Sequence, residues 1–98
     1  MSPMTAVVVD DEPLARRGLI HLLGKEPGIN VVADFGQPAR ALEYITAHHP
    51  DVVFLDIMMP DMDGYEVCRI VKSDDLTAKI PIIFITSKDD EEDEIKGF

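Results

Sequence analysis

The chain has 98 residues, which is enough for one domain with one hydrophobic core and too few for two. Its formal charge of −10 at pH 7 argues against direct binding to nucleic acid or to an anionic membrane surface. The single cysteine cannot form an internal disulfide, and the apolar stretches are too short to span a bilayer. We therefore expect a soluble cytoplasmic protein.

The first predicted elements are a strand over Thr5–Val9 and a helix that begins at Pro13 and ends before Pro27. Proline suits the first turn of a helix, where its missing N–H has no intrahelical partner. The apolar positions that recur at helical spacing are Leu14, Gly18 or Leu19, and Leu22 or Leu23. The polar positions predicted on the opposite side of the helix are Arg16, Arg17 and His21.

A second strand is predicted over Asn30–Phe35, and a helix over Gln37–His48 closes at Pro50. A third strand, Val52–Leu55, runs directly into Asp56. The inward positions expected on the second helix are Ala41, Leu42 and Ile45.

After Asp56 the sequence predicts a turn-rich loop in which Gly64 holds a backbone arrangement that a Cβ would strain. A helix over Tyr65–Ser73 and a fourth strand over Ile82–Ile85 follow. The acidic run from Asp89 suits the start of a further helix, because the helix dipole favours negative charge there.

Strands that alternate with helices predict right-handed βαβ units and a three-layer α/β sandwich around a parallel sheet. The apolar runs without polar alternation indicate strands buried on both faces. Ligands of such sheets bind outside the carboxyl ends of the strands, where Asp10, Asp11, Asp56 and Thr86 are expected to converge.

Several carboxylates in one crevice stay ionised together only if a cation offsets their charge. Oxygen ligands favour a hard ion such as Mg²⁺, and a carboxylate held beside it can attack a phosphoryl group and form an acyl phosphate. Thr86 could donate its hydroxyl to a phosphoryl oxygen. A simpler interpretation also holds: Asp11 could only shape a turn or cap a helix, and Thr86 could cap the helix that follows.

Three segments resemble the receiver domain of two-component response regulators. They are Val-Val-Val-Asp-Asp-Glu-Pro (7–13), Val-Val-Phe-Leu-Asp-Ile-Met-Met-Pro-Asp-Met-Asp-Gly (52–64) and Ile-Pro-Ile-Ile-Phe-Ile-Thr-Ser (80–87). The resemblance spans residues 1–98 as one receiver domain and implies a flavodoxin-like fold with strand order 2-1-3-4. It also implies a signalling module that catalyses only its own phosphotransfer and dephosphorylation.

The resemblance assigns roles to individual residues. Asp56 would accept a phosphoryl group from a histidine kinase or a phosphotransfer protein. Asp11 and the backbone carbonyl of Met58 would join Asp56 around Mg²⁺, with Asp10 assisting through water. Thr86 would be the switch hydroxyl.

Relatives continue into a fifth strand and a last helix, which carry a lysine that contacts the phosphoryl oxygens. We therefore expect a receiver truncated at its C-terminal end, with impaired switch output and with Ile82–Ile85 as an exposed edge that pairs with a second copy. An alternative is a phosphorylation-independent interaction or dimerisation module. A haloacid dehalogenase-type phosphatase is disfavoured because Asp10 is followed two residues later by Glu12 rather than by an aspartate.

Overall fold

The computed structural model describes residues 2–85, in which strands and helices alternate. The elements are β1 (Met4–Val9), α1 (Pro13–Leu23), β2 (Ile29–Phe35), α2 (Pro38–His48), β3 (Val52–Asp56), α3 (Gly64–Ser73) and β4 (Ile82–Ile85). The predicted bounds agree with these to within one residue, and α1 ends at Leu23, before Pro27 as predicted. The helix expected from Asp89 and the switch residue Thr86 lie outside the described residues.

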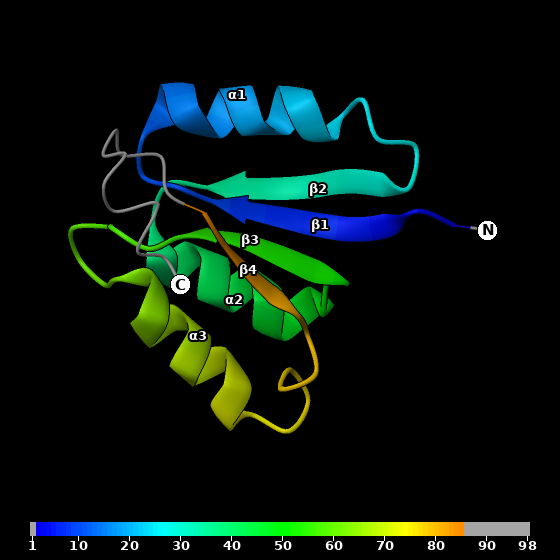
Figure 1. Ribbon diagram of the computed structural model, residues 1–98. Helices are drawn as coiled ribbons and strands as arrows, with labels where there is room; N and C mark the ends of the chain where they lie inside the picture. The colour runs from blue at the N-terminus through cyan, green and yellow to red at the C-terminus, as the bar shows by residue number, and fades with distance from the viewer. Residues whose placement is uncertain (1, 86–98) are drawn as a thin grey trace.

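The four strands form one parallel sheet in the order β2-β1-β3-β4. Helix α1 covers one face of the sheet, and α2 and α3 cover the other (Figure 1). The three layers follow from crossovers of one hand that return each strand to the same sheet. The predicted α/β sandwich and its flavodoxin-like strand order are confirmed.

The core is built on the two central strands. Residues Ala6 to Val9 of β1 are completely buried, and in β3 the side chains of Val53 and Leu55 are completely buried as well. Ala41 and Ile45 of α2 and two valines of α3 close the larger core on one face of the sheet. Burial on both faces is therefore confirmed for β1, whereas in β3 one face is completely buried and Phe54 on the other face is half-buried.

Strand β4 is as apolar as β3 but is much less buried. Ile83 is 45% exposed and Phe84 is 37% exposed. Within the described part of the chain β4 pairs only with β3, so it forms an edge of the sheet. Apolar composition predicted the strand correctly. The burial on both faces that this composition indicates is wrong for β4 among these residues, whereas the exposed edge predicted from the resemblance agrees with them.

Helix α1 is rotated relative to the prediction. Leu14 and Leu22 are 74% and 59% exposed, whereas the side chain of Arg16 is only 23% exposed. The inward face follows the spacing of Arg16, Leu19 and the buried Leu23, which also lie three or four residues apart. Leu19 and Leu23 were among the predicted apolar positions, but Leu14 and Arg16 were assigned to the wrong sides, because the arginine was treated as a solvent-facing residue.

The described helices are 11, 11 and 10 residues long, and none has the length and apolar character that crossing a lipid bilayer requires.

Candidate functional site

Two aspartates lie at the carboxyl ends of the central strands because those strands are in register. β1 and β3 pair in parallel with Val9 opposite Leu55, so the next residues, Asp10 and Asp56, reach the same edge of the sheet. Asp56 is the last residue of β3 and is completely buried; Asp10 is 1% exposed. The strand-end argument from the sequence therefore placed both residues correctly.

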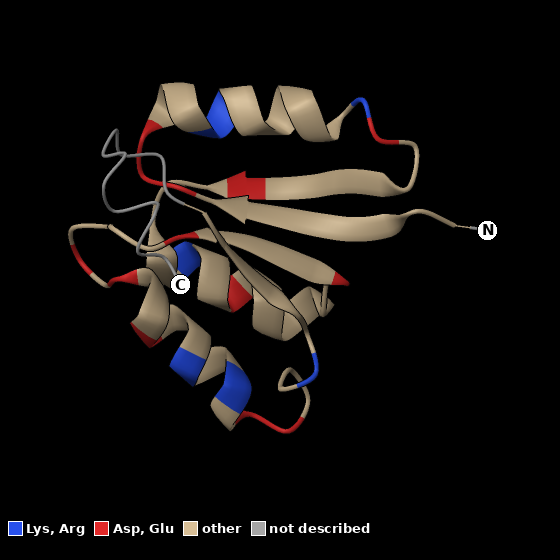
Figure 2. Cartoon of the chain, viewed as in Figure 1, with Lys and Arg blue, Asp and Glu red and all other residues tan. Residues whose placement is uncertain are grey.

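Asp11 completes an acidic group with these two residues. One carboxylate oxygen from each of Asp10, Asp11 and Asp56 lies within 4.8 Å of the others. Figure 2 shows acidic positions in the loops that leave the carboxyl ends of β1 and β3. The structure thus brings together three of the predicted site residues from two separate segments of the chain.

Both buried carboxylates also shape the turn that follows them. Oδ1 of Asp10 accepts a hydrogen bond from the backbone N–H of Glu12 at 2.9 Å, and Oδ1 of Asp56 accepts one from Met58 at 3.2 Å. Such bonds to the residue two positions on are the ordinary turn role of aspartate. Asp10 and Asp56 therefore shape turns and also converge with Asp11, the residue for which the turn role was predicted. The N-cap of α1 is Glu12 rather than Asp11.

The acidic group has the donors that a hard cation requires. Carboxylate oxygens are ligands that Mg²⁺ accepts, usually one or two of them together with carbonyl oxygens and water. Three carboxylates within 4.8 Å repel one another strongly when ionised, so a divalent cation among them is favourable. Met58, predicted to contribute its carbonyl, lies in the loop after β3 and is 54% exposed.

An open cavity of about 470 Å³ adjoins the acidic group. Its lining is mostly apolar and comes from the β3–α3 loop, the start of α3 and the end of the β1 loop. The lining residues are Asp11, Ile57, Met58, Met59, Pro60, Asp63 and Tyr65. A small group bound to the acids would therefore have room beside Asp11 without displacing the sheet.

Gly64 brings the end of this loop back onto β3. Its N–H donates to the carbonyl of Ile57 at 2.8 Å, and a Cβ built on it would lie 2.5 Å from the carbonyl oxygen of Asp56. No described glycine has a positive φ. The glycine is required by this close backbone approach, not by a left-handed conformation.

Of two further residues near the site, Thr86 was predicted from the sequence and Arg16 was not. Thr86 lies outside the described residues, but it directly follows Ile85, which pairs with Asp56 across the sheet. Arg16 was missed, and its guanidinium contacts the backbone of Asp10. Its position one helical turn before the Leu19–Ile20 pair and two turns before Leu23 is the signal that could have placed it on the inward face.

Comparison with known proteins gives a consistent family. The pattern of the response regulator receiver domain matches residues 6–98. An uncharacterised response regulatory protein of Vibrio cholerae is 47% identical over 88 residues, which cover 88% of this chain and 33% of that protein. The probable transcriptional regulatory protein NarL of Mycobacterium tuberculosis is 44% identical over 77 residues, 79% of this chain and 36% of its own length. The chain thus spans about a third of the length of these curated relatives.

A solved structure extends this agreement to three dimensions. The signal receiver domain of NarL from Mycobacterium tuberculosis superimposes with a TM-score of 0.79 at 36% identity. The superposition covers 94% of this chain and 73% of that one. The same parallel sheet and helix layers are therefore present in a receiver domain of clearly related sequence.

Proposed function

Since the chain belongs to the response regulator receiver domain family, we propose that it is a phospho-accepting module whose acceptor is Asp56. The donor would be a phosphohistidine on a histidine kinase or on a phosphotransfer protein, and the reaction would depend on Mg²⁺. The observation that carries the proposal is the convergence of three carboxylates, two of them buried, within 4.8 Å at one end of the sheet. The module signals and does not turn over a separate substrate.

In the proposed transfer a carboxylate oxygen of Asp56 attacks the phosphorus atom of the phosphohistidine. A new oxygen–phosphorus bond forms, the phosphorus–nitrogen bond breaks, and the imidazole nitrogen leaves with the electron pair. The N–H of Met58, which donates to Oδ1 of Asp56, orients the nucleophilic carboxylate. Asp56 is completely buried at the end of a strand that pairs with β1 on one side and β4 on the other, which restrains the position of its carboxylate.

The metal would be held by Asp10, Asp11, Asp56 and the backbone carbonyl of Met58. When bound, Mg²⁺ supplies positive charge that offsets the repulsion between these carboxylates and the phosphoryl oxygens. Asp10 and Asp11 place two carboxylates at the end of β1, next to the carboxylate that would carry the phosphoryl group.

Thr86 is proposed as the switch hydroxyl that contacts a phosphoryl oxygen. Support comes from the register of β4, in which Ile85 lies opposite Asp56. The residue after Ile85 in the sequence is Thr86, which is one residue beyond the partner of the proposed acceptor. A hydroxyl at that position in the chain is suited to contact a phosphoryl group on Asp56 and so to respond to its phosphorylation.

We further propose that the chain acts in the cytoplasm and pairs with a second copy through β4. The single cysteine and the charge of −10 fit a reducing compartment and no direct contact with nucleic acid or membrane.

The exposed Ile83 and Phe84, on β4 at the edge of the described sheet, support the pairing with a second copy. Interaction without phosphorylation is the weaker alternative, because it leaves the buried acidic group without a role.

Intact-mass spectrometry of the chain incubated with acetyl phosphate tests the proposal, with and without MgCl₂. We expect a gain of one phosphoryl group that requires Mg²⁺ and is absent in Asp56→Asn. Asp61→Asn is the matched control, because Asp61 is an exposed aspartate of the same loop outside the acidic group. No gain in a sample shown to be folded by circular dichroism contradicts the proposal, and a gain that persists in Asp56→Asn excludes Asp56 as the acceptor.

A further inference from the structure

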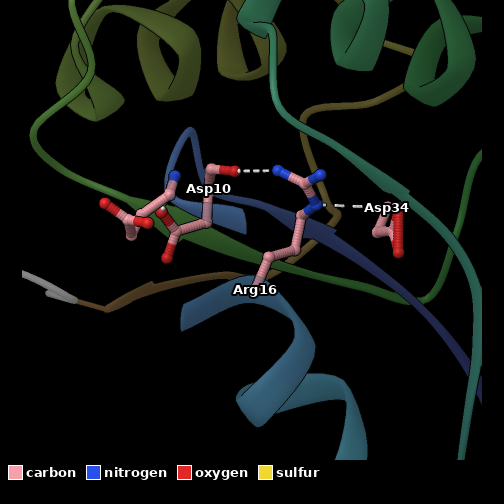
Figure 3. A network of polar contacts seen from close by, with 4 residues as sticks. Asp10, Arg16 and Asp34 are labelled. Atoms are coloured by element: carbon pink, nitrogen blue, oxygen red, sulfur yellow. Dashed lines mark hydrogen bonds and ion pairs between the residues drawn. The ribbon is translucent and has the colours of Figure 1, made fainter. Parts of the chain in front are cut away.

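Arg16 joins helix α1 to the carboxyl ends of β1 and β2 (Figure 3). Its Nη1 donates to the backbone carbonyl of Asp10 at 2.6 Å, and its Nε lies 3.8 Å from Oδ1 of Asp34. The arginine side chain is 23% exposed and the Asp34 side chain is 41% exposed. One guanidinium therefore bridges three elements directly beside the acidic group.

The contact at Asp10 determines how the chain leaves β1. The N–H of Asp10 donates to the carbonyl of Phe35 at 3.0 Å, so β2 holds this residue on one side and Arg16 holds its carbonyl on the other. That carbonyl belongs to the peptide unit between Asp10 and Asp11, and the unit is planar. Fixing the carbonyl therefore fixes the plane from which the Asp11 side chain projects toward Asp10 and Asp56.

The geometry favours orientation over ion-pair stability as the main effect of Arg16. Its pair with the partly exposed Asp34 is long and screened by solvent, and such pairs contribute little. The bond to the Asp10 carbonyl is short and comes from a charged donor, which makes it the stronger of the two. Gly36 leaves room for the guanidinium, because a Cβ there would lie 2.9 Å from Nη1.

We propose that Arg16 is a positioning residue of the acidic site, which holds the Asp10–Asp11 peptide so that the carboxylates of Asp10 and Asp11 converge on Asp56. It acts through the backbone carbonyl of Asp10 rather than through a carboxylate. The proposal rests on the metal site of the proposed function. It adds a residue of α1 that contributes to metal affinity through another residue's backbone.

The charge of Arg16 makes this proposal easy to distinguish from a simple electrostatic role. A cation beside the acids repels Mg²⁺, so removing it tightens metal binding if charge alone matters. Losing an outer contact that orients ligands weakens metal binding instead, typically 10–100-fold. The two explanations therefore predict changes of opposite sign.

Calorimetric titration of the full chain with MgCl₂ tests this prediction on Arg16→Gln and on Arg17→Gln. Arg17 is the matched control because it is the next residue of α1, carries the same charge and is exposed. We expect Arg16→Gln to bind Mg²⁺ about tenfold more weakly, and Arg17→Gln to bind as the parent does or slightly more tightly. Circular dichroism in EDTA establishes before titration that each variant is folded.

Gly36→Ala supplies a second variant that changes no charge. Its methyl group lies 2.9 Å from Nη1 and shifts the end of the arginine side chain away from the Asp10 carbonyl. Mg²⁺ affinity therefore falls in the same direction as in Arg16→Gln but by less, and this variant decides the matter if Arg16→Gln does not fold. In both variants the Mg²⁺ concentration that half-saturates phosphorylation by acetyl phosphate rises, while the rate at saturating Mg²⁺ stays close to that of the parent.

The outcomes distinguish failure of the Arg16 role from failure of the proposed metal site on which it rests. Unchanged or tighter Mg²⁺ binding in both folded variants overturns the positioning role of Arg16 and leaves the proposed metal site intact. Absence of Mg²⁺ binding in the unaltered chain overturns the metal site itself, and the role of Arg16 with it.

Discussion

The backbone of Gly64 lies so close to the carbonyl oxygen of Asp56 that a Cβ on the glycine would come within 2.5 Å of it. The same Cβ would lie 2.9 Å from the Cα of Ile57. Both neighbours are backbone atoms of the segment that carries the proposed acceptor, so neither can move away without moving that segment. The start of α3 is thereby packed directly against the site.

Gly64→Ala is expected to lower the free energy of unfolding by about 1–3 kcal/mol, the usual cost of forcing extra volume into a packed region. It should also slow phosphorylation by acetyl phosphate, because the strain is relieved by shifting Asp56 or Ile57. Urea unfolding followed by circular dichroism measures the first effect and intact mass against time measures the second.

Gly18→Ala is the control for this substitution. A Cβ on Gly18 would meet nothing within 4 Å, and the residue lies inside α1. Alanine there should stabilise the protein by about 0.5–1 kcal/mol, since glycine is a poor helix former. If Gly64→Ala behaves like Gly18→Ala, the close approach of α3 to β3 does not constrain the site.

Metal binding should make stability depend on Mg²⁺ concentration. At a hundred times the Kd, a ligand that binds only the folded state adds about 2.7 kcal/mol to the free energy of unfolding. Asp56→Asn should lose most of this increment. Without Mg²⁺ the same variant should be more stable than the parent, by about 1 kcal/mol, because one of three mutually repelling carboxylates has become neutral.

Urea titrations in EDTA and at saturating MgCl₂ measure both effects, with Asp61→Asn as the control for loss of an exposed charge. The predicted pattern is a crossing: the variant is more stable than the parent without metal and less stable with it. A variant that is less stable under both conditions would show that Asp56 matters for folding rather than for the cation.

The fold could be predicted well because each buried strand is an uninterrupted apolar run in the sequence. The positions of Asp10 and Asp56 followed from the rule that parallel strands end at one edge, and register then placed the two residues together. No further information was needed for this part of the site.

Arg16 could not be placed in the same way. Its polarity suggested the solvent side of α1, and the closer of its two partners is a backbone carbonyl, which does not depend on the identity of residue 10. Gly64 was singled out correctly, but the reason for the glycine is a long-range backbone contact with Asp56, and sequence pattern does not show such contacts. Composition predicts which apolar residues are buried. It predicts less readily on which side of a helix a charged side chain lies.

Asp63 should stabilise the start of α3 as its N-cap. Its carboxylate accepts a hydrogen bond from the N–H of Glu66 at 2.9 Å. Asp63→Ala is expected to lower the free energy of unfolding by about 1 kcal/mol, whereas Asp63→Asn, which keeps the acceptor, should be nearly neutral. Urea unfolding compares these with Asp61→Ala, an exposed position in the same loop. Equal effects of the Asp63→Ala and Asp61→Ala substitutions would mean that the cap contributes nothing measurable.

Pairing through β4 should depend on Ile83, which is 45% exposed on that edge strand. Ile83→Lys adds a charge that hinders edge-to-edge pairing while leaving the monomer room for the longer side chain. Sedimentation velocity over a range of concentrations should show a monomer–dimer equilibrium for the parent chain and a monomer for the variant. Val32→Lys is the matched control, because Val32 is 40% exposed on β2 at the opposite edge of the sheet. A parent chain that stays monomeric contradicts the pairing, and a dimer that only Val32→Lys disrupts would move the interface to β2.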